Sequence, residues 1–101
     1  MKNLLLAAAL LLTVAVPAQA GCHTKSVSLY GAYWCPACAS AKRFLSSNNI
    51  NYRYIEVTNN RQAQKTMLKQ FGMVAVPAVV IDGRRRMGFD KSWVSKVLCL
   101  G

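Results

Sequence analysis

The stretch YWCPACAS, residues 33–40, places Cys35 and Cys38 three positions apart, with a proline and an alanine between them. Residues three apart share one face of a helix, so the two sulfur atoms can meet there. Such a pair can exchange a disulfide with another molecule, supply half of a zinc site, or brace the fold as a structural bridge. Which of these applies depends on the elements that position the two sulfur atoms.

Cys35 falls at the predicted junction between a strand and a helix. Residues 26–30 are short and β-rich and predict a buried first strand, and residues 31–34 predict a turn. Pro36 suits the first turn of a helix, where its missing N–H is not needed. The start of a helix carries partial positive charge and free N–H groups, which stabilise a thiolate. Cys35 is therefore the predicted nucleophile, with a pKa below the value of about 8.5 of a free thiol, and Cys38 is the predicted resolving thiol.

The rest of the chain alternates strands with helices. Three further strands are predicted, at residues 52–57, 78–81 and 84–89. Two more helices are predicted, one with an inner face formed by Ala63, Met67, Leu68 and Phe71, and one after Asp90 with an inner face formed by Trp93, Val94, Val97 and Leu98. This order of elements predicts an α/β domain, a four-stranded mixed sheet with helices on both faces.

From residue 26 to residue 98 the chain resembles the thioredoxin superfamily, and glutaredoxins most closely. Three motifs carry the resemblance: Trp34–Cys38 after the first strand, Ala75–Pro77 before the third strand, and Gly88–Asp90 before the last helix. The resemblance implies a thioredoxin/glutaredoxin-like βαβαββα fold and a thiol–disulfide oxidoreductase whose redox-active disulfide is Cys35–Cys38. It also implies a cis proline that faces the two cysteines, and these substrate-binding residues: Trp34, Pro36, Val76, Pro77, Gly88, Phe89 and Asp90.

The sequence departs at three positions from glutaredoxins that use glutathione. Ala32 stands where a lysine is usual, Ala37 replaces a tyrosine, and Ala75 replaces a threonine. Usual contacts to glutathione are therefore missing. The resemblance implies protein thiols or disulfides as partners, with glutathione as a less supported alternative, no tightly bound cofactor, and a monomeric protein.

Two other interpretations of the cysteine pair stay open at this point. One is a metal or iron–sulfur cluster site, whose further ligands would have to come from Cys22, Cys99 or His23, because the chain has no second Cys-X-X-Cys. The other is a non-catalytic binding module held together by disulfides. That module would leave Pro77 and an exposed Trp34 unexplained.

Residues 1–20 have the pattern of a secretory signal peptide, with a positively charged start, an apolar run at residues 4–16 and an Ala-Gln-Ala end. The apolar run is shorter than the roughly 17–25 residues of a membrane-spanning helix. The mature glutaredoxin-like domain would be residues 21–101, exported to the periplasm or secreted into an oxidising space. The alternative is a lipoprotein anchored at Cys22, because residues 19–22 resemble a lipoprotein box.

Export and an even number of cysteines favour disulfides. The first strand runs toward Cys35 and the last helix runs back, so Cys22 and Cys99 should lie together at the opposite end of the domain. We therefore expect a structural disulfide between Cys22 and Cys99.

The chain has 13 Lys and Arg against 3 Asp and Glu, a net charge of +10. Such an excess favours anionic surroundings, such as a membrane surface, and the alternative is a simply solvated basic surface. No basic–aromatic interleaving points to stacking on bases, so nucleic acid is not a predicted partner.

Overall fold

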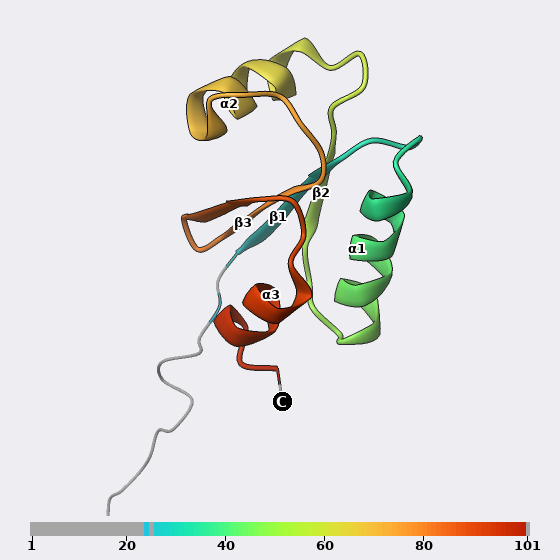
Figure 1. The fold of residues 1–101 in the computed structure, drawn as a ribbon, viewed down its shortest axis with the longest axis vertical. Helices are drawn as coiled ribbons and strands as arrows, with labels where there is room; N and C mark the ends of the chain where they lie inside the picture. Colours follow the sequence, from blue (N-terminus) through green and yellow to red (C-terminus); the bar gives the residue numbers. More distant parts are fainter. Residues whose placement is uncertain (1–23, 25, 101) are drawn as a thin grey trace, which may run out of the picture.

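The computed structural model describes residues 24 and 26–100 of the chain, as four strands and three helices (Figure 1). In chain order these are β1 (Val27–Gly31), α1 (Pro36–Ser47), β2 (Arg53–Glu56), α2 (Arg61–Phe71), β3 (Ala78–Ile81), β4 (Arg84–Met87) and α3 (Lys91–Val97).

The four strands form one mixed sheet in the order β2-β1-β3-β4. β1 pairs with β2 in parallel, and β3 pairs antiparallel with both β1 and β4. The parallel pair requires a crossover, which α1 supplies, whereas β3 and β4 are joined by a tight turn at Asp82-Gly83. A four-stranded mixed sheet was predicted, whereas the order of its strands was not.

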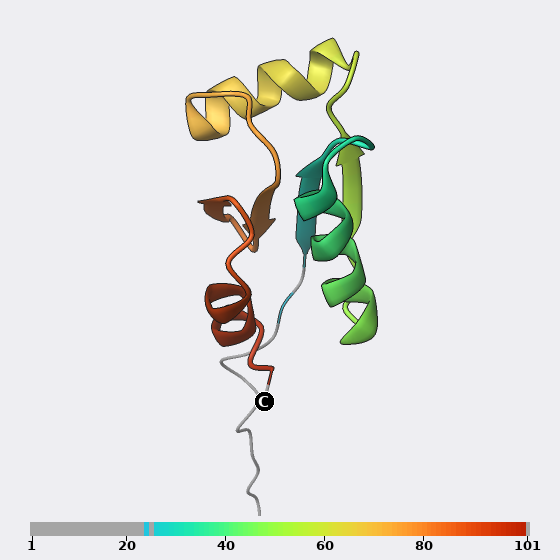
Figure 2. The same ribbon diagram turned by 45° about the vertical axis from the view of Figure 1, so that its right-hand side comes forward.

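Helices cover both faces of the sheet. Successive side chains on each strand point to opposite faces, and the strands carry apolar side chains on both. Leu29 and Val79 belong to the core that also holds Ala41 of α1 and Val94 of α3. The intervening side chains pack against α2, in a second cluster formed by Tyr30, Val57, Ala63, Met67 and Ala78. Figure 2 shows α2 separated from α1 and α3. The predicted fold class is therefore confirmed.

The predicted inner face of α2 was wrong at Leu68, whose side chain is 53% exposed. Ala63 and Met67 are buried and lie four residues apart, and Phe71 continues the same stripe. A helix turns by about 100° at each residue, so the neighbour of a central stripe residue points away from the sheet.

The predicted fourth strand also extended too far, because β4 ends at Met87 and not at Phe89. Gly88 adopts a φ of +82°, which an extended strand does not allow. Phe89 then turns into the core, where its ring meets Phe44 edge-to-face at a centroid distance of 5.8 Å. None of the helices in the described part of the chain is long and apolar enough to cross a membrane.

Candidate active site

Cys35 and Cys38 lie where the turn after β1 enters α1, and they are joined by a disulfide with Cα atoms 5.2 Å apart. Cys35 is the N-cap of α1, and the backbone N–H of Cys38 donates to its Sγ at 3.1 Å. Cys35 is 8% exposed and Cys38 is fully buried. A hydrogen bond from the helix start favours an anionic sulfur. Cys35 is therefore the sulfur that another molecule can reach, and it is also the sulfur that the helix start activates.

The wall behind the cysteines is apolar. Ala32 is buried against the two cysteines, and Val76 packs on the same cluster from the segment before β3. The Val76–Pro77 peptide bond is cis, as the resemblance implied, and Pro77 is buried. The backbone N–H of Gly88 donates to the Pro77 carbonyl at 2.7 Å, which ties the end of β4 to this segment. The structure thus brings Val76, Pro77 and Gly88 to the site from two separate segments of the chain.

Exposed apolar side chains stand on the two segments that reach the cysteines. Tyr33 and Trp34, directly before Cys35, are 78% and 61% exposed. Met73 and Val74, in the loop that leads to Pro77, are 51% and 43% exposed. Large apolar groups left in water often mark a contact surface. The indole of Trp34 is held in place by its own N–H, which donates to Thr58 Oγ1 at 3.1 Å.

The carboxylate of Glu56, at the end of β2, supports the turn that carries these aromatic side chains. Its Oε2 accepts from the backbone N–H of Tyr33 at 3.1 Å and from that of Thr58 at 3.4 Å. Its Oε1 accepts from the Tyr54 hydroxyl at 2.9 Å. Hydrogen bonding from the Thr58 side chain, then from Tyr54 and the two backbone groups, keeps the pKa of Glu56 below its usual value although burial acts in the opposite direction. Glu56 is therefore ionised at neutral pH.

The Tyr54 ring and Cys38 both border the space beside Gly31. A Cβ atom on Gly31 would lie 2.9 Å from Tyr54 Cε1 and 3.2 Å from Cys38 Cβ. The Nζ atom of Lys42, on α1, lies 4.0 Å from the centroid of the Tyr54 ring. Burial first, and then the hydrogen bond to Glu56, raises the pKa of Tyr54 to about 12, so its hydroxyl stays protonated and donates.

The other predicted site residues have structural contacts of their own. Pro36 occupies the first turn of α1, Phe89 packs on Phe44, and Asp90 caps α3 through the N–H groups of Ser92 and Trp93. Their roles in substrate binding stay predictions. Cys99 is disulfide-bonded, and its predicted partner Cys22 lies outside the described residues, as do His23 and the predicted signal peptide.

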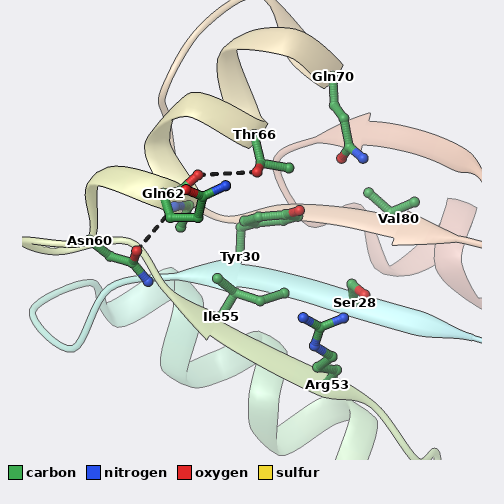
Figure 3. A pocket seen from close by; sticks show the side chains of 10 residues that line it. Ser28, Tyr30, Arg53, Ile55, Asn60, Gln62, Thr66, Gln70 and Val80 are labelled. Carbon is green, nitrogen blue, oxygen red and sulfur yellow. Dashed lines mark hydrogen bonds between the residues drawn. The ribbon is translucent and has the colours of Figure 1, made fainter.

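The described residues hold no cluster of metal ligands, and a groove among them lies apart from the cysteines. Residues 24 and 26–100 contain no cluster of three or more His, Cys, Asp or Glu side chains that could hold a metal ion. A polar groove of about 420 Å³ lies between α2 and the face of the sheet that α2 covers (Figure 3). Its walls include Tyr30, Arg53 and Gln70, but neither Cys35 nor Cys38.

Tyr54, Glu56 and Thr58 were not among the predicted site residues. One signal was available, because residues two apart on a strand share a face, which places Tyr54 and Glu56 side by side. Glu56 is also one of only three acidic residues in the chain. Nothing in the sequence links them to Tyr33 and Trp34, since that contact depends on the parallel pairing of β1 and β2.

Comparison with known proteins agrees with this geometry. Residues 27–86 match the glutaredoxin family model. An uncharacterized glutaredoxin-like 8.6 kDa protein from the rubredoxin operon of Clostridium pasteurianum is 31% identical over 75 residues, which cover 71% of this chain and 96% of that protein. Glutaredoxin 3 of Escherichia coli strain K12 is 31% identical over 65 residues, covering 64% and 78%. A solved thioredoxin-like protein superposes with a TM-score of 0.71 at 30% identity, covering 76% and 99%. The chain therefore belongs to the glutaredoxin family of thiol–disulfide oxidoreductases, and its Cys35–Cys38 pair occupies the place where such chemistry needs two sulfur atoms.

Proposed function

We propose that this chain is an exported oxidoreductase that exchanges disulfides with the cysteines of other proteins. The observation that carries the proposal is the position of Cys35, which caps α1 and is the more exposed of the two bonded sulfurs. The exposed Tyr33 and Trp34 beside it favour a protein or peptide substrate, because they offer apolar contact area that a small thiol does not need. Pro77, Val76 and Gly88 would form the wall along which the substrate segment lies.

The exchange proceeds in two steps. In the oxidising direction, a substrate thiolate attacks Sγ of Cys35, a bond forms between the two sulfurs, and the Cys35–Cys38 bond breaks with Cys38 leaving as a thiolate. A second substrate thiolate then attacks the substrate sulfur of this mixed disulfide and releases Cys35 as a thiolate. Two electrons have passed from the substrate to the cysteine pair. Reduction of a substrate disulfide is the same sequence reversed, and the relative reduction potentials set its direction.

Two matched variants test the proposal. Cys35→Ser should lose exchange activity on a protein substrate such as insulin. Cys38→Ser should accumulate a mixed disulfide with the substrate, because the resolving thiol is gone, and this complex should appear on a non-reducing gel. Parental activity in Cys35→Ser would place the chemistry elsewhere. A mixed disulfide formed with glutathione but never with a protein would instead favour glutathione as the partner.

We infer export from residues 1–20, whose sequence fits a signal peptide, and with export a structural Cys22–Cys99 disulfide. The intact mass of the protein recovered from its native compartment tests both. A chain that begins at residue 21, without free thiols at Cys22 and Cys99, is the expected result. A diacylglycerol-sized addition at Cys22 would show the lipoprotein alternative to be correct.

A further inference from the structure

Glu56 makes contacts that the exchange steps themselves do not require. Its two oxygens accept from Tyr33 and Thr58 on one side and from Tyr54 on the other. Tyr33 lies two residues before Cys35, and Thr58 in turn accepts from the indole of Trp34. One carboxylate on β2 therefore fixes both the backbone and the exposed side chain of the turn that leads into α1.

We propose that Glu56 is a positioning residue of the redox couple, which fixes the turn that presents Cys35 and keeps a negative charge beside the thiolate that forms there. This inference rests on thiol–disulfide exchange at Cys35. It concerns the acidity of the thiol and is independent of the substrate on which the enzyme acts.

The charge of Glu56 opposes the helix start. The N-terminus of α1 stabilises an anionic sulfur at Cys35, whereas a carboxylate held on the Tyr33 N–H destabilises it. Among the residues that the structure describes, no lysine or arginine forms an ion pair with Glu56. Lys42 of α1 faces the same network, but it lies over the ring of Tyr54, whose hydroxyl is neutral. Glu56 thus makes Cys35 less acidic than the helix start alone would, and it favours the disulfide over the dithiol.

Glu56→Gln separates the charge of this side chain from its geometry. The amide oxygen can accept from the N–H groups of Tyr33 and Thr58 as Oε2 does. The amide NH₂ can donate to the oxygen of Tyr54, because a tyrosine hydroxyl both donates and accepts. The turn is kept and only the negative charge is lost.

The matched control is Asp82→Asn. Asp82 accepts from the backbone N–H of Ser26 at 2.8 Å, at the end of β3 away from Pro77. This variant changes the net charge by the same amount as Glu56→Gln, but at the end of the sheet opposite to Cys35 and Cys38.

The test is the pH dependence of the alkylation of Cys35 by iodoacetamide in the reduced protein, with the labelled residue identified by mass spectrometry. Glu56→Gln should lower the midpoint by about half a pH unit, the size expected of one nearby, partly screened charge. Asp82→Asn should leave the midpoint at the parental value. Tyr54→Phe removes a hydrogen bond from the carboxylate but leaves its charge, so it should move the midpoint upward.

Alkylation needs no substrate, so this test stays valid if the proposed substrate class is wrong. An unchanged or raised midpoint in Glu56→Gln, at unaltered resistance to urea, would overturn the proposal and leave Glu56 with a purely structural role. Should Glu56→Gln fail to fold, Tyr54→Phe decides, and a lowered midpoint in that variant would equally overturn it.

Discussion

The two cysteines of the couple differ in their surroundings, and this difference supports the proposed roles of Cys35 as nucleophile and Cys38 as resolving thiol. Cys35 has access to solvent, and its sulfur accepts a backbone hydrogen bond. Cys38 is buried, with Ala32 in the same apolar cluster and Gly31 close to its Cβ atom. A buried thiol one helical turn inside is protected from outside reagents, yet it can still attack a mixed disulfide on its neighbour. The packing around Cys38 therefore fits the resolving role proposed for this thiol.

Gly31→Ala tests this packing. The new methyl group would lie 2.9 Å from Tyr54 Cε1, closer than real Cβ atoms approach other atoms, and 3.2 Å from Cys38 Cβ, which is a tight contact. Overpacking of this kind costs about 1–3 kcal/mol, more than alanine gains over glycine in a strand. The free energy of unfolding, from urea denaturation, should fall by that amount.

The control repeats Gly31→Ala in a Tyr54→Ala background, which removes the ring from the contact. The cost should then shrink, since only the contact with Cys38 Cβ remains. Equal costs in both backgrounds would show that the ring does not limit the space beside Gly31.

At the scale of elements, a side chain marks the start of each helix. Each of the three helices begins at a side chain that accepts backbone N–H groups: Cys35 for α1, Asn60 for α2 and Asp90 for α3. In α1 the capping atom is the reactive sulfur itself, so the chemistry and the helix start occupy one position. In α3 the capping residue Asp90 also pairs with Arg86 at 3.3 Å.

Asp90→Ala should destabilise the protein by about 1 kcal/mol, because the N–H groups of Ser92 and Trp93 lose their acceptor at the start of a short helix. Asp90→Asn keeps an acceptor and loses only the exposed ion pair with Arg86, so it should cost less. Thermal or urea unfolding measures both variants. An equal loss in the two variants would show that the ion pair, and not the cap, holds α3.

At the scale of the whole molecule, the positive charge is poorly balanced. All three acidic residues make internal contacts: Glu56 with the turn before Cys35, Asp82 with Ser26 and Asp90 with α3. The edge strand β4 carries three consecutive exposed arginines, Arg84–Arg86, in a position where charge also discourages pairing with another chain. This basic surface predicts an association with anionic membranes, as an alternative to a simply solvated surface.

Sedimentation with phospholipid vesicles tests this inference. The protein should bind vesicles that contain phosphatidylglycerol at about 0.05 M salt and should dissociate at about 0.5 M, because exposed charges are then screened. Pure phosphatidylcholine vesicles serve as the control and should not bind. A variant with glutamine at positions 84–86 should bind more weakly, and unchanged binding would contradict a role for β4.

Local features of the sequence were enough to predict the order of strands and helices, the fold class and the redox pair, although not every boundary of a strand. Apolar periodicity and turn residues fixed where strands and helices form, since both are local properties of the chain. The spacing of Cys35 and Cys38 at a helix start was likewise local, and so was the resemblance to glutaredoxins that the family match confirms.

The tertiary structure alone decided what surrounds the pair. Residues distant in sequence meet there only after β1, β2 and β3 have paired: Glu56 with Tyr33, Thr58 with Trp34, and Val76 with the cysteines. The exposure of Leu68 and the early end of β4 were decided in the same way, because an apolar side chain is buried only where another element covers it. Contacts between distant residues depend on how the strands align, and no local pattern in a single sequence specifies that alignment.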